Sequence, residues 1–81
     1  MRVKITKIGI LPHGEHSVFA AIGDDFIGRA AGYPKLGERY NVYGNVSLEI
    51  STSPVTKEID EEGIFETTYS RYQLIVLNKL D

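Results

Sequence analysis

Cysteine and tryptophan are both absent from this 81-residue sequence. Without cysteine the chain can form neither a disulfide nor a thiolate metal site, although small secreted domains of this length usually depend on such bridges. No apolar run approaches the roughly 20 residues that a membrane helix requires. Residues 1–7 alternate charged and apolar side chains and lack the continuous apolar stretch of a signal peptide. We therefore expect a cytoplasmic protein with no membrane contact.

Charge of one sign is also scarce, because nine Lys and Arg oppose eleven Asp and Glu to give a formal net charge of −2. The charges are unevenly distributed: Arg2, Lys4 and Lys7 make the start basic, whereas residues 58–66 are acidic and contain no Lys or Arg. Binding to a nucleic-acid backbone draws its affinity largely from clustered Lys and Arg. This balance disfavours a general nucleic-acid binder and favours a basic partner for the acidic segment.

Hydrophobic residues recur with a period of two along most of the chain, and the helical period is almost missing, which predicts an all-β protein. In residues 2–10, Val3 and Ile5 share one face while Ile8 and Ile10 have the opposite parity. A bulge near residues 6–7 would turn all four side chains inward. Gly, Pro and Asp clusters separate the predicted strands. These strands cover residues 2–10, 17–22, 26–31, 38–43, 46–51, 55–59, 64–68 and 72–77.

The expected architecture is a single all-β domain over residues 1–81. About seven short antiparallel strands in so short a chain favour a small bent sheet or a closed barrel of the SH3-like or OB-like kind, since closure removes exposed strand edges. A two-sheet sandwich is the alternative. Residues 17–22 and 26–31 are predicted to form a hairpin. The most apolar segment, 72–77, should either be covered on both faces or close the barrel at a seam.

No cluster of residues predicts catalysis or metal binding. His13 and His16 flank Glu15, but zinc sites need at least three protein ligands and the chain has no further histidine. Ser17 is the one serine near a histidine, and this proximity alone does not make a nucleophile. The carboxylates at 24–25 and 60–62 are typical of turns. We therefore expect no enzyme activity, no metal and no cofactor.

Tyrosines and basic residues are interleaved in the middle and near the end of the chain. Small barrels bind single-stranded nucleic acid by stacking bases on aromatic side chains within a positive groove. Tyrosine and arginine are also enriched at protein-binding hot spots. The weak positive charge favours a protein partner over nucleic acid, which stays the alternative. The candidate nucleic-acid-binding residues are Tyr33, Lys35, Arg39, Tyr40 and Arg71.

Three motifs occur in a fixed order, and they are Pro34-x-x-Gly37-x-x-Tyr40, Thr52-Ser53-x-Val55 and Thr67-x-x-Ser70-x-Tyr72-x-Leu74. Together they resemble a pattern in small uncharacterised proteins of bacteriophages and prophages, over roughly residues 34–77. Tyr69 stands where such proteins usually have asparagine. The resemblance implies a phage or mobile-element origin and no catalytic residue. By analogy with small phage β-proteins, it implies binding to a host protein, such as a nucleic-acid enzyme or a defence factor.

Three functions from different classes follow. The first is a non-catalytic protein-binding module that acts as an inhibitor or accessory factor on a host protein. The second is single-stranded nucleic-acid binding, and the third is a phage structural or assembly protein that pairs with another copy through an edge strand. The residues expected to carry the first function are Glu58, Asp60, Glu61, Glu62, Glu66, Tyr69 and Arg71.

Overall fold

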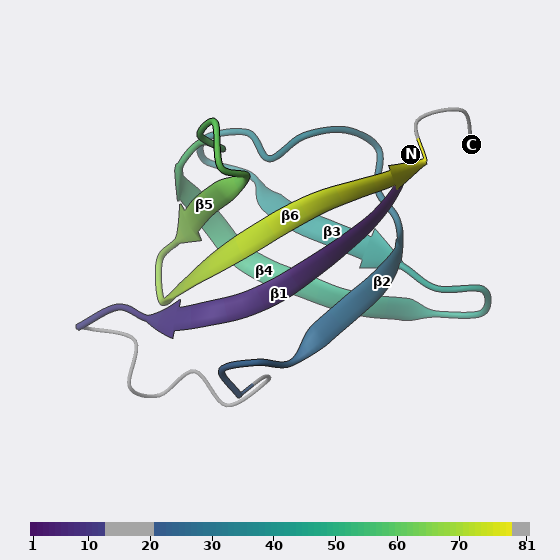
Figure 1. Ribbon diagram of the computed structural model, residues 1–81, viewed down its shortest axis with the longest axis horizontal. Helices are drawn as coiled ribbons and strands as arrows, with labels where there is room; N and C mark the ends of the chain where they lie inside the picture. The colour runs from purple at the N-terminus through teal and green to yellow at the C-terminus, as the bar shows by residue number, and fades with distance from the viewer. Residues whose placement is uncertain (13–20, 79–81) are drawn as a thin grey trace.

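The chain folds into a closed barrel of antiparallel strands, and the computed structural model describes residues 1–12 and 21–78. Each strand pairs with the next, and the last strand pairs with the first (Figure 1). The prediction of a small all-β barrel is confirmed, with six strands where about seven were expected. Within the described residues no helix could span a membrane. The strands are β1 (Arg2–Ile10), β2 (Asp25–Arg29), β3 (Arg39–Tyr43), β4 (Leu48–Lys57), β5 (Ile64–Thr67) and β6 (Ser70–Asn78).

The long strand β4 accounts for part of the difference in strand number, because it runs without a break through Pro54, where the sequence predicted two strands. Arg39 faces Pro54 while Asn41 faces Ser51, so β4 carries one extra residue at this point. Such a bulge tolerates proline, which cannot donate to the ladder. Thr52 Oγ1 accepts the Tyr40 N–H at 3.0 Å and so supplies a backbone donor with a side-chain partner.

The described part of the chain does not form the predicted hairpin of residues 17–22 with 26–31. Ala21 and Ile22 lie outside any strand just before β2, and β2 pairs with β1 over Asp25–Arg29. Residues 17–20 lie outside the described residues. The expected turn role of Asp24 is confirmed, since its Oδ2 accepts the Ala21 N–H at 2.9 Å.

The barrel interior contains a group of three aromatic rings. The ring of Phe65 stacks on Tyr72 with centroids 5.4 Å apart, and it meets Tyr40 edge-on at 5.5 Å. These rings come from β3, β5 and β6, so they join strands that are distant in the sequence. The buried hydrophobic side chains are Val3, Ile5, Ala30, Tyr40, Val42, Ile50, Val55, Phe65, Tyr72 and Leu74.

The inward positions of β1 differ from the prediction at its second half. The register shift lies between Lys7 and Gly9, one step later than expected, so Lys7 follows Val3 and Ile5 into the interior. Ile10 lies directly opposite the buried Ser70, on the inward side of β1, but its side chain is 45% exposed at the end of the strand. Burial lowers the pKa of Lys7, and the nearby Asp24 carboxylate opposes this change. A lysine therefore takes a position that the alternation pattern assigned to an apolar side chain.

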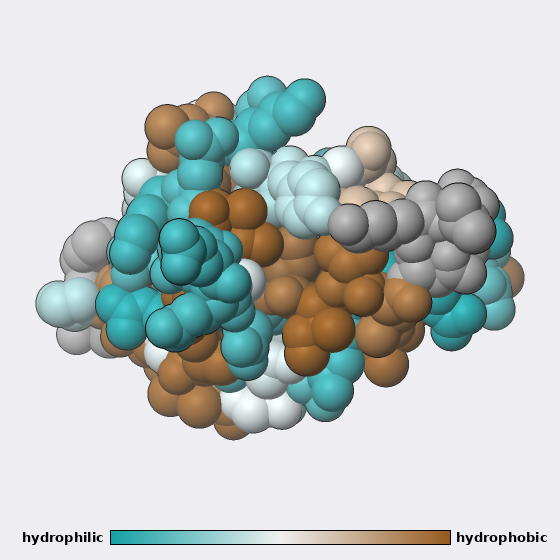
Figure 2. All heavy atoms as spheres, turned by 45° about the horizontal axis from the view of Figure 1, so that its top comes forward, coloured by the Kyte–Doolittle hydropathy of each residue, from teal (hydrophilic) through white to brown (hydrophobic). Residues whose placement is uncertain are grey.

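Strand β6 closes the barrel against β1, as predicted for its apolar sequence. Tyr72 and Leu74 are buried, but Ile75 and Leu77 on the opposite face are exposed. The alternative of a strand covered on both faces is therefore wrong. Figure 2 shows hydrophobic side chains gathered near the centre of the face that β6 presents, with hydrophilic ones on both flanks.

Two glycines with the same backbone angle offer a test of the turn between β4 and β5. Gly63 and Gly37 both have φ of 81°, a conformation that strains other residues. A Cβ on Gly63 would lie 2.6 Å from the Leu74 carbonyl oxygen, whereas one on Gly37 would meet nothing within 4 Å. Gly37→Ala should lower the free energy of unfolding by about 1 kcal/mol, and Gly63→Ala by about 2–4 kcal/mol. Urea titrations followed by tyrosine fluorescence measure both, and equal losses would contradict the predicted clash.

Candidate functional site

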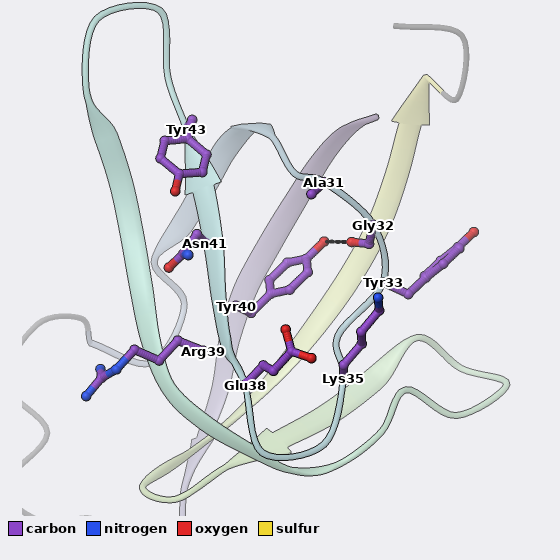
Figure 3. Close-up of a pocket in the computed structure, with 9 residues that line it drawn as sticks. All are labelled: Ala31, Gly32, Tyr33, Lys35, Glu38, Arg39, Tyr40, Asn41 and Tyr43. Carbon is purple, nitrogen blue, oxygen red and sulfur yellow. Dashed lines mark hydrogen bonds between the residues drawn. The ribbon is translucent and has the colours of Figure 1, made fainter.

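A shallow pocket of about 240 Å³ lies where the loop after β2 crosses β3. We call it the β3 pocket. Figure 3 shows Lys35, Glu38 and the ring of Tyr40 on one side of β3, with Arg39 directed away on the other side. The charged groups are thus spread along the strand and do not converge on one point. The pocket is lined by Ala31, Gly32, Tyr33, Lys35, Glu38, Arg39, Tyr40, Asn41 and Tyr43.

Tyr40 joins this pocket to the barrel interior. Its ring packs on Phe65, and its hydroxyl donates to the Gly32 carbonyl at 2.8 Å. This bond holds the loop against β3, and two backbone bonds between the loop and Val55 hold its other end. Burial raises the pKa of Tyr40 to about 12, with a further contribution from Tyr33. Tyr40 is therefore a structural residue and not a stacking surface.

A second pocket of about 490 Å³ adjoins the first and shares Tyr43 with it. We call it the arginine pocket, because Arg2 and Arg29 line it together with Ile27, Gly28, Gly44, Asn45 and Glu49. Gly28 is required here, since a Cβ at this position would collide with the backbone carbonyl of Tyr43. The close approach of β2 and β3 thus depends on a missing side chain.

The structure brings together four of the five residues predicted to bind nucleic acid. Tyr33, Lys35, Arg39 and Tyr40 all line the β3 pocket. Arg71 does not belong to this group, because it lies on β6 and its guanidinium contacts Glu66 Oε2 at 2.8 and 2.9 Å. Sequence reasoning missed Arg2, Arg29 and Tyr43, which only the cross-strand register places beside the predicted residues.

The predicted protein-binding residues surround β5 and the turns on either side of it. Asp60 is engaged in the first turn, where its Oδ1 accepts the N–H groups of Glu62 and Ile64 at 2.9 and 3.0 Å. The bond from Ile64 is the main cause of a lowered pKa for Asp60. Glu66 pairs with Arg71. The remaining acidic side chains are exposed, and they are Glu58, Glu61 and Glu62.

Residues 1–12 and 21–78 contain no group of three or more His, Asp or Glu that could hold a metal ion. The histidines considered at the sequence level, His13 and His16, lie outside the described residues together with Glu15 and Ser17. In the described part of the chain, no hydrogen bond joins a nucleophile to a base in either pocket. Their chemistry is that of cations, tyrosines and single carboxylates.

Positive and negative charges are separated along the molecule. The two pockets together contain four cations and two carboxylates, Glu38 and Glu49. The acidic turn between β4 and β5 lies at one end of the barrel, and the β3–β4 turn beside the arginine pocket lies at the other (Figure 1). In a protein with a net charge of −2, the two pockets thus carry more cations than carboxylates.

The raised pKa of Tyr40 predicts a loss of stability at alkaline pH. Tyrosine in an unfolded chain ionises near pH 10, so this contribution to stability is complete below about pH 10 and is lost as the pH rises toward 12. Burial also raises the pKa of Tyr72. Tyr40→Phe should therefore reduce, but not abolish, the fall in unfolding free energy between about pH 9 and pH 11. Urea titrations across this range measure the slope, and an unchanged slope would refute the assignment to Tyr40.

No family model, curated protein or solved structure matches the chain. A function must be inferred from the pockets and from the distribution of charge.

Proposed function

We propose that the barrel binds single-stranded nucleic acid along the outer side of β3 and the loop that precedes it. The observation that carries this proposal is the placement of two half-exposed tyrosines, Tyr33 and Tyr43, in one pocket with Lys35 and Arg39. Aromatic side chains stack on any base, and cations beside them follow the phosphates. Together they form the two elements that sequence-independent single-strand binding requires.

The spacing of the cations supports an extended ligand over a small one. Arg39, Asn41 and Tyr43 occupy alternate positions along the outer side of β3, whereas Lys35 extends from the preceding loop on the other side of the strand from Arg39 (Figure 3). Adjacent outward positions on a strand lie about 6.6 Å apart, so this set covers roughly 13 Å of strand. A small molecule would be held by groups that converge on it. A chain of nucleotides instead needs contacts at successive positions.

The cations of this face are available to phosphates. Within the described residues neither Lys35 nor Arg39 has a carboxylate within 4 Å of its charged nitrogens. Arg39 donates to the Thr52 carbonyl at 3.1 Å, which orients the guanidinium and leaves its charge uncompensated. Glu38 lies in the same pocket and reduces the field, so we expect affinity that is modest and strongly dependent on salt.

Two matched pairs of residues test this proposal. Tyr33 and Tyr69 are 47% and 45% exposed, but only Tyr33 lines the β3 pocket. Stacking contributes about 1–3 kcal/mol per base, so Tyr33→Ala should weaken binding at least about fivefold while Tyr69→Ala should leave it nearly unchanged. Lys35→Ala should also lower the slope of log K against log salt concentration by about one, and the control Lys57→Ala should not.

The measurement is fluorescence anisotropy with labelled single-stranded DNA and RNA oligonucleotides at low salt. Circular dichroism of each variant shows whether the barrel remains folded. Absence of binding by the wild-type protein at low salt would refute the function, and equal losses in Tyr33→Ala and Tyr69→Ala would refute the assigned site.

Protein binding is the second candidate, and the acidic turn between β4 and β5 favours it. Glu58, Glu61 and Glu62 are exposed, and within the described chain no cation lies within 4 Å of their carboxylates. Such a surface is complementary to a basic protein, including the nucleic-acid channel of a host enzyme, in line with the resemblance to phage proteins. The third alternative, pairing through an edge strand, is less favoured because every strand of the closed barrel already has two neighbours.

Charge reversal at the exposed glutamates tests this second candidate without damage to the turn. Glu58→Lys, Glu61→Lys and Glu62→Lys combined should abolish capture of a specific host protein in pull-downs from lysate, because the electrostatic match is lost. Asp60 is left intact, since its carboxylate is bonded within the turn. Lys57→Glu serves as a control that adds charge of the opposite sign nearby. Equal capture by the wild type and the triple variant would refute a role for the acidic surface.

A further inference from the structure

We infer that the arginine pocket is a subsite for a single phosphorylated nucleotide, with the phosphate held between Arg2 and Arg29 and the base stacked on Tyr43. This inference rests on the proposed function, because it assigns one end of the same binding surface. It names the ligand class as a nucleoside monophosphate or a nucleotide that ends in a phosphomonoester.

The register of the three strands brings the side chains of these residues together. Arg2 lies directly opposite Arg29, and Arg29 lies directly opposite Tyr43. Residues directly opposite in antiparallel strands have Cβ atoms about 5 Å apart and point to the same face. The three side chains therefore form a row across β1, β2 and β3. All three are exposed and line one pocket.

The second step is the electrostatics of this row. Like charges directly opposite each other in a sheet are destabilising. Within the described residues neither arginine has a carboxylate within 4 Å, although Lys4 on the same face reaches Asp25 at 3.9 Å. Two opposed guanidiniums with no carboxylate partner among residues 1–12 and 21–78 match the charge of a phosphomonoester and can donate several bonds to its oxygens.

The third step is the far side of the pocket. Glu49 lines it from β4 and lies over Gly44, where a Cβ would collide with its carboxylate. Tyr43 separates this carboxylate from the arginines, because β3 lies between β2 and β4. With strands about 4.8 Å apart, the row from β2 to β4 spans roughly 10 Å. A base on Tyr43 would present its edge to Glu49, and a carboxylate accepts hydrogen bonds from the amino group of cytosine.

The pocket is large enough for this ligand. Its volume of about 490 Å³ lies within the range of roughly 300–1,000 Å³ that is typical of small-molecule sites. Gly28 lets β2 approach the Tyr43 backbone closely, and Gly44 leaves room for the Glu49 carboxylate at the edge of the pocket. The β3 pocket, with about half the volume, continues from Tyr43 along the strand.

The test is a titration of the ¹⁵N-labelled protein with CMP, UMP, cytidine and inorganic phosphate, followed by NMR chemical shifts. CMP should bind at least roughly tenfold more tightly than cytidine, and inorganic phosphate should compete with CMP. Arg2→Gln and Arg29→Gln should each remove most of this difference, whereas Arg71→Gln should not. CMP should also bind more tightly than UMP, and Glu49→Gln should reduce that preference. The dispersion of the amide spectrum shows whether each variant is folded.

The outcomes separate this inference from the proposed function. Equal binding of CMP and cytidine, or loss of CMP binding in Arg71→Gln as large as in Arg29→Gln, would overturn the subsite. If oligonucleotides still bind in the anisotropy assay, the proposed function stands without it. Oligonucleotides with a 5′-phosphate, a 3′-phosphate or neither then show which end of a strand the subsite accepts, and equal affinity of all three would exclude a terminal phosphate as its ligand.

Discussion

The packing of Tyr40 against Phe65 connects the interior of the barrel to the β3 pocket. The ring of Tyr40 belongs to the aromatic group that joins β3, β5 and β6, while its hydroxyl bonds to the carbonyl of Gly32 in the loop. The position of Tyr33 and Lys35 therefore depends on a residue that no ligand needs to touch. In a domain of this size without disulfides, one core supplies nearly all the stability. The same core also fixes the shape of the β3 pocket.

Local pattern was sufficient to predict the fold class, but not the pairing. Alternation in residues 38–43 puts Tyr40 and Val42 on one face of the strand, and both side chains are buried in the structure. Alternation failed at Lys7, which lies in the interior because the bulge follows it, and the pattern does not show where a strand must bend. Pro54 falls in the gap between the predicted strands 46–51 and 55–59, although its missing donor lies at a bulge that only the partner strand reveals. Features set by contact between distant segments were the ones the sequence could not provide.

The candidate site likewise combines residues that are close in the sequence with residues that only strand pairing brings together. Tyr33, Lys35, Arg39 and Tyr40 lie close together in the sequence, and the structure keeps them in one pocket. Arg2 and Arg29 lie 27 positions apart and become neighbours only through strand register. Net charge was misleading for a related reason: it sums over the whole chain, whereas a ligand responds to the local field. The acidic turn lies at one end of the barrel and the β3–β4 turn beside the arginine pocket lies at the other, so the sum conceals both.

The opposed arginines conflict with stability in a way that supports a ligand. A single substitution at position 2 or 29 to an uncharged residue would relieve the cross-strand repulsion, and the outer face of β1 already shows the alternative, since Lys4 lies 3.9 Å from Asp25. Gly28 and Gly44 are a second feature at this place that lowers stability. Glycine within or beside a strand weakens it, yet Gly28 allows the close approach of β2 to the Tyr43 backbone and Gly44 leaves room for the Glu49 carboxylate. Unfavourable charge and weakened strands at one place in a small barrel are typical of a surface shaped by what it binds.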